Sequence, residues 1–147
     1  FGPSVMDNGT RRSVYLRVKR SELIPFMTMF DVPEPTQSVG GRISTTVPTQ
    51  ALTLMNSPFV RQQAERLLSR LKVNAEMPAE QAFDSAIEQA YRLAFSRRPN
   101  DSERERMKGF VQQQLQLTGG TTPAHRNQAL LEFCHVLLCL NEFMYVD

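Results

Sequence analysis

The sequence predicts a mainly α fold: a bundle of about four to five antiparallel helices, preceded by an N-terminal extended arm or short strand. From residue 46 onward, apolar residues recur at the spacing of one helix face. Capping residues followed by proline or glutamate mark the helix starts. Near the N-terminus the apolar pattern instead has a period of two. We therefore expect a single helical domain over residues 1–147, with an extended basic arm and loop in 1–45 and a helical core in 46–147.

The N-terminal arm begins with an alternating segment over residues 13–19. One side is apolar and the other is polar, in the pairs Val14 and Tyr15, Leu16 and Arg17, Val18 and Lys19. This alternation is typical of a half-buried strand, and a lone strand is not stable. We expect it to pair with upstream chain or to lie across the helices as an arm.

A short helix and a loop connect the arm to the core. Ser21 is expected to cap a helix from Leu23 to Phe30, which the prolines at 33 and 35 end. A loop follows to about Thr45, with two glycines at its centre.

The core is expected to contain helices over about 48–56, 58–71, 78–95, 101–118 and 123–140. Asn100 and Glu103 have the spacing of a capping box, and Thr122 precedes a proline at the start of the last helix. Apolar residues cover most of the circumference of that last helix, at Leu130, Phe133, Cys134, Val136, Leu137, Leu138 and Leu140. We predict that it is the central helix of the bundle.

Length and composition indicate one hydrophobic core. The 147 residues are 41% apolar and 22% charged, which is typical of a globular domain. No run of about 18 apolar residues occurs, so we expect no membrane span. The chain begins at Phe1, so we expect a fragment of a larger protein, and the upstream part of that protein is an expected partner.

The positive charge is concentrated near the N-terminus. Residues 1–50 hold six Lys or Arg against four Asp or Glu, whereas residues 51–147 hold eleven of each. A nucleic-acid-binding domain usually has a basic balance over a whole face, so nucleic acid is not an expected partner.

One basic cluster is a candidate for anion binding: Arg11, Arg12, Arg17, Lys19 and Arg20. These cations are expected to pair either with acids such as Asp31, Glu34 and Glu142, or with upstream chain. Alternatively they form a face that binds a sulfated or carboxylated polysaccharide or an acidic protein.

Two cysteines and a histidine invite a metal or haem interpretation, which their spacing does not support. Cys134, His135 and Cys139 match neither the haem-attachment pattern nor a zinc pattern. Residues five apart on a helix have Cα atoms about 8 to 9 Å apart, too far for a disulfide. We expect two buried thiols, hydrogen-bonded or solvated histidines at 125 and 135, no cofactor in this fragment, and no catalytic or metal-binding residue.

Several short motifs resemble a Planctomycete-type domain of unknown function at the C-terminal end of large exported proteins, many of which begin with a cytochrome c module. The motifs occur in the order found in that family: Arg11–Tyr15, Lys19-Arg20, Pro25–Met27, Phe30-Asp31 with Pro33, Thr45–Pro48, Gln50–Leu52, Leu54–Asn56, Tyr91–Ala94, Arg97–Pro99 and Asn141–Phe143 with Tyr145.

The resemblance implies export to the periplasm or cell surface but no activity, since the family has no established function. We expect a non-catalytic interaction or scaffolding module at the C-terminus of a large exported, redox-associated protein. One alternative is an anionic polysaccharide-binding module that uses the basic arm. The other is part of an enzyme whose site is completed by missing upstream chain.

Overall fold

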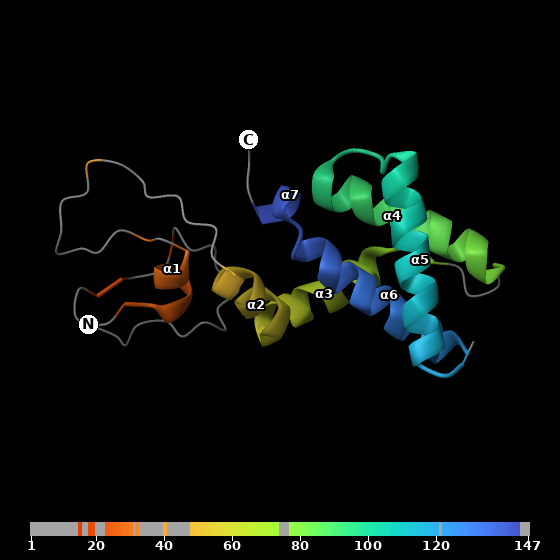
Figure 1. Cartoon of the computed structure of the whole chain (residues 1–147), viewed down its shortest axis with the longest axis horizontal. Coiled ribbons are helices and arrows are strands. Elements are labelled where there is room, and N and C mark those ends of the chain that lie inside the picture. Colours follow the sequence, from red (N-terminus) through yellow and green to blue (C-terminus); the bar gives the residue numbers. More distant parts are fainter. Residues whose placement is uncertain are drawn as a thin grey trace. The chain divides into compact units, whose positions relative to one another are not determined.

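The computed structural model describes residues 15, 18, 19, 23–30, 32, 40, 48–73, 77–120 and 122–144 (Figure 1). The chain divides into two compact units, Phe1–Leu54 and Met55–Asp147. The mainly α class and the helical bundle are confirmed. The described elements are α1 (Pro25–Met29), α2 (Pro48–Asn56), α3 (Pro58–Arg70), α4 (Ala79–Phe95), α5 (Asp101–Leu117), α6 (Pro123–Leu138) and α7 (Asn141–Met144). The division falls within α2, and the partition at residue 45 stays a prediction.

The first unit holds α1 and most of α2. The Gln50 side-chain amide donates a hydrogen bond of 2.8 Å to the Met29 carbonyl oxygen. Gln50 is only 5% exposed, and Ile24 and Leu54 are each 6% exposed. This bond connects the last residue of α1 to α2. It also gives the buried Gln50 amide the hydrogen-bond partner that a buried polar group needs.

The period-two pattern at residues 13–19 predicted the wrong environment for Val18. Val18 was expected on the apolar side of a strand, yet it is 40% exposed. Of this segment, only Tyr15, Val18 and Lys19 are described, and among these three Lys19 forms an isolated bridge. A single bridge forms no sheet face against which a valine would pack.

The second unit starts its helices where the sequence predicted. The Ser57 hydroxyl accepts from the Val60 backbone amide, and the Thr122 hydroxyl accepts from that of His125. Asn100 and Glu103 form the predicted capping box, each side chain accepting from the other residue's backbone N–H at 2.8 Å. These bonds satisfy amides that have no partner within the helix itself.

Helix α6 is the centre of the second unit, as predicted. It contacts α3, α4, α5 and α7. Phe133 and Leu137 are fully buried, and Leu130 is 1% exposed. Its most prominent charge, Glu132, accepts bonds of 3.0 and 2.8 Å from the Arg61 guanidinium of α3. The helix therefore buries its apolar side chains and directs its acid to a neighbouring helix.

The C-terminal end of α6 differs from the prediction of one helix running to Leu140. The helix ends at Leu138, where the Cys139 amide turns to the carbonyls of Val136 and Leu137. A separate short helix, α7, then contacts α4 and α6. This break places Glu142 beside the loop between α4 and α5.

Among the helices of the described residues, none combines the length and the hydropathy of a membrane-spanning segment.

Candidate functional site

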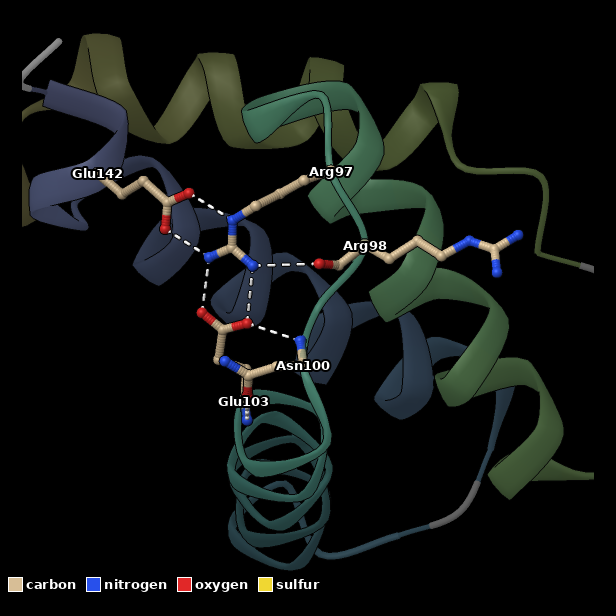
Figure 2. A network of polar contacts seen from close by, with 5 residues as sticks. All are labelled: Arg97, Arg98, Asn100, Glu103 and Glu142. Atoms are coloured by element: carbon tan, nitrogen blue, oxygen red, sulfur yellow. Dashed lines mark hydrogen bonds and ion pairs between the residues drawn. The ribbon is translucent and has the colours of Figure 1, made fainter. Parts of the chain in front are cut away.

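The best-formed polar cluster of the second unit is a network that we call the Arg97 clamp: Arg97, Asn100, Glu103, Glu142 and the carbonyl of Arg98. Figure 2 shows the Arg97 guanidinium between the two carboxylates. The chain reaches this position because Ser96 ends α4 in the left-handed conformation, with φ of 58°. A helix end of this kind turns the chain sharply, and here it points the following arginine back across the loop.

Every N–H donor of Arg97 is used inside the domain. The Nε–H donates to Glu142 at 2.6 Å, and Nη2 donates to Glu103 and Glu142, both at 2.6 Å. Nη1 donates to Glu103 at 2.8 Å and to the Arg98 carbonyl at 3.1 Å. A guanidinium has five N–H donors, so these five bonds leave none for a ligand.

Aromatic rings form the apolar side of the clamp. The Arg97 guanidinium carbon lies 5.5 Å from the centre of the Tyr91 ring and 5.7 Å from that of Phe95. Phe95 packs edge-on against both Tyr91 and Phe143, with ring centres 5.2 and 6.5 Å apart. Contacts of a cation with aromatic faces add to the ion pairs and restrict the arginine further.

The electrostatics of the clamp stabilise its charged form. Hydrogen bonds from Arg97 lower the pKa of Glu103 to about 2, and the Asn100 backbone N–H adds to the effect. Arg97 also lowers the pKa of Glu142. In return, the two carboxylates raise the pKa of Arg97, so each partner favours the charged form of the other.

A protein-family model described as "Protein of unknown function (DUF1553)", with the name PSD1, matches residues 3–111. The chain belongs to this family. No curated protein and no solved structure matches the chain. The family therefore assigns no reaction, and the match ends within α5.

The DUF1553 match includes Tyr91, Arg97 and Glu103, three members of the clamp and its aromatic side. Glu142 and Phe143 lie beyond the matched residues. Their resemblance to the family's C-terminal motif, inferred from the sequence, stays a prediction. In the structure, the motifs at 97–99 and 141–143 meet through the bonds from Arg97 to Glu142.

Sequence reasoning identified Arg97 and Glu142 as motif residues but missed their contact. Their separation of 45 residues hides the pair, because only the position of α7 brings them together. The capping box was the one available signal, since it places the Glu103 carboxylate at the first turn of α5. Glu142 had been suggested as a partner for the basic cluster, and the structure pairs it with Arg97.

The predicted anion-binding cluster is largely beyond what the structure describes. Lys19 is half-buried at the isolated bridge, and the other four residues lie outside the described residues: Arg11, Arg12, Arg17 and Arg20. Anion binding by this cluster therefore stays a prediction.

The thiols and histidines follow the expectations only in part. One ring nitrogen of each histidine, His125 Nδ1 and His135 Nε2, is buried without a hydrogen-bond partner, contrary to the expectation of hydrogen-bonded or solvated histidines. Cys134 is fully buried, and desolvation raises the pKa of its thiol to about 12. Cys139 is only half-buried, contrary to the expectation of two buried thiols, because it lies at the end of α6. Both are free. Burial also raises the pKa of Cys139, which disfavours the reactive thiolate. Across the described ranges, no three His, Cys, Asp or Glu side chains form a group that could hold a metal ion.

A groove of about 280 Å³ lies on α4 and α5, with Phe83 and Gly109 among its lining residues. Its charged groups are already paired in part, since the Lys108 ammonium lies 2.8 Å from Asp84 and 3.8 Å from Glu105. Its acids and its amine are those of ion pairs on α4 and α5, one of which connects the two helices. Asp84 raises the pKa of Lys108, which keeps the amine protonated and disfavours its use as a nucleophile, so the groove indicates no particular reaction.

Proposed function

We propose that the chain is a non-catalytic interaction or scaffolding module and that its Arg97 motif acts to hold the module together. The observation that carries the proposal is the complete use of the Arg97 donors by Glu103, Glu142 and a backbone carbonyl. An arginine that binds substrate must direct N–H groups at the ligand. Arg97 directs all of them inward.

The free-energy balance of the clamp also supports a structural role. Removing Arg97 would leave the Glu103 and Glu142 carboxylates close together without a shared cation, and their repulsion, reduced by solvent screening, would destabilise this arrangement. The clamp joins the α4–α5 loop to α7, so it anchors the C-terminal helix of the unit. A module that presents helix faces to a partner needs such an anchor.

We further propose that the module is the C-terminal part of a large exported, redox-associated protein, and that it holds no cofactor of its own. Support for export and for the redox association comes from the sequence resemblance alone. The upstream part of the same protein is then the first partner to test. In the competing enzyme hypothesis, that upstream part would complete a catalytic site.

An association measurement tests the proposed interaction with the upstream part. The chain and the upstream part of its protein are produced as separate polypeptides and titrated by isothermal calorimetry. A scaffolding module should bind with micromolar or tighter affinity. Absence of measurable association would overturn the proposal.

Arg97→Ala provides the discriminating variant, tested well below its melting temperature. A scaffolding role predicts association close to that of the unaltered chain, because Arg97 contacts no partner. A completed enzyme site that uses Arg97 would instead lose ligand binding or turnover in the mixture. Arg66→Ala, which removes an exposed arginine from α3, is the matched control.

The basic arm keeps the polysaccharide hypothesis as a second candidate. Five of the ten residues from 11 to 20 are Lys or Arg, with no acid among them. An anionic glycan would be attracted to this density of charge.

A further inference from the structure

A second group of arginines, on α4 and α5, is held around a single acid. We call it the Glu88 arginine cluster: Glu88, Arg92, Arg98 and Arg104. The Glu88 carboxylate lies 2.7 Å from the Arg92 guanidinium, 3.3 Å from that of Arg98 and 3.9 Å from that of Arg104. These residues come from α4, from the α4–α5 loop and from α5, so the fold has gathered them.

The cluster has more positive than negative charge. Three guanidiniums share one carboxylate, which leaves an excess of two positive charges (3 − 1 = 2). The neighbouring carboxylates of Glu103 and Glu142 are bound to Arg97. Asp101, in the first turn of α5, forms no ion pair with these arginines in the part of the chain that is described. The excess is therefore not neutralised by these acids.

Two of the three guanidiniums are accessible to a partner. The Arg98 side chain is 70% exposed and the Arg92 side chain 50% exposed. Figure 2 shows the Arg98 side chain extending away from the Arg97 clamp. Its closest approach to Glu88 is through Nε, so its two terminal amino groups lie further from that carboxylate than Nε does. Such a planar fork matches a carboxylate in bidentate geometry.

We propose that the Glu88 arginine cluster binds an acidic segment of a protein partner, through its Asp or Glu side chains. The ligand class follows from the group already present, because Glu88 shows that a side-chain carboxylate fits among the three guanidiniums. The inference rests on the proposed interaction function and names the chemistry of the partner. It uses residues of the second unit and is independent of the basic arm.

The first measurement is the binding of a fluorescein-labelled oligoglutamate peptide to the whole chain, by fluorescence anisotropy at low and at physiological salt. Binding should weaken as salt rises, because exposed charges are screened over about 8 Å at physiological ionic strength. An oligolysine peptide of the same length should not bind. Heparin is titrated in parallel, since a site for sulfated glycans would prefer it.

Three variants locate the site. Arg92→Gln with Arg98→Gln should weaken oligoglutamate binding about tenfold. Arg66→Gln with Arg70→Gln removes the same charge from exposed positions on α3 and should change affinity less than about twofold. Glu88→Gln removes the competing carboxylate and should strengthen binding about threefold, which a purely structural role for the cluster does not predict.

The proposal is overturned by any of three results: no oligoglutamate binding at low salt, equal losses in the two double variants, or binding of heparin without oligoglutamate. Circular dichroism must show the same helix content in every variant. If the Arg92 and Arg98 double variant does not fold, the Glu88→Gln result decides. Association with the upstream polypeptide is a separate measurement, so failure here does not remove the scaffolding proposal.

Discussion

The two units of the chain use arginine in contrasting ways. The second unit, Met55–Asp147, holds eleven Lys or Arg and eleven Asp or Glu, while Phe1–Leu54 holds six and four. In the second unit, Arg97 and Arg61 each bind a carboxylate from a distant part of the chain. In the first unit the excess cations have too few acids to pair with. Arginine is thus a structural element at Arg61 and Arg97 of the second unit, and a candidate ligand group in the basic arm and in the Glu88 arginine cluster.

The largest effect should come from the core of the second unit. Leu137→Ala is expected to cost about 2 to 5 kcal/mol in unfolding free energy, because the fully buried leucine of α6 leaves a cavity. Leu117→Ala is the matched control, since Leu117 is 73% exposed at the end of α5 and its loss should change stability by less than about 0.5 kcal/mol. Urea denaturation measures both. Similar midpoints for the two variants would refute the central position of α6.

Acid should weaken the clamp next. The pKa of Glu103 in the folded chain is about 2, below the ordinary value of 4.5. A carboxylate whose pKa is lowered by folding stabilises the folded state fully at pH values above its ordinary pKa. This contribution is lost as the pH falls from about 4.5 toward 2. We expect the free energy of unfolding to fall by an amount on the order of 1 to 2 kcal/mol, a figure that already includes the reduction by solvent screening.

Unfolding free energies measured by urea at several pH values test this loss. The Arg97→Gln variant is the control and should show a smaller fall over the same range. An equal fall in both proteins would mean that other carboxylates control the acid sensitivity.

The smallest effect on stability should come from the arm. Charge reversal at Arg17 and Lys19 is expected to abolish retention on a heparin matrix and to leave the melting temperature nearly unchanged. Unfolding by these reversals would instead make the arm cations structural, and the contrast between the units would disappear. Failure of the unaltered chain to bind any anionic polymer at low salt would remove the glycan hypothesis.

Local signals in the sequence were enough to predict the helices of the second unit. Ser57, Asn100 and Thr122 each satisfy an amide within their own first turn, so their effect depends on neighbours three residues away. The apolar circumference of α6 likewise predicted its burial. Such patterns can be recognised in the sequence without knowledge of the rest of the fold.

The candidate sites depend on contacts that no local pattern contains. Arg97 and Glu142 meet only because the chain breaks after Leu138 and α7 turns back. The three arginines around Glu88 were missed for the same reason, although the spacing of Glu88 and Arg92 is that of a helical ion pair. Val18 shows the opposite error, because an alternating pattern cannot supply the sheet that would bury it.

A double-mutant cycle on Arg97 and Glu142 tests most directly whether the family motif is an internal structural clamp. Arg97→Gln, Glu142→Gln and the double variant are compared with the unaltered chain by urea denaturation at neutral pH. The two bonds between these side chains, which are 37% and 45% exposed, predict a coupling energy of roughly 0.5 to 1 kcal/mol. Additive effects, with a coupling energy near zero, would contradict the clamp and return Arg97 to the list of candidate ligand-binding residues.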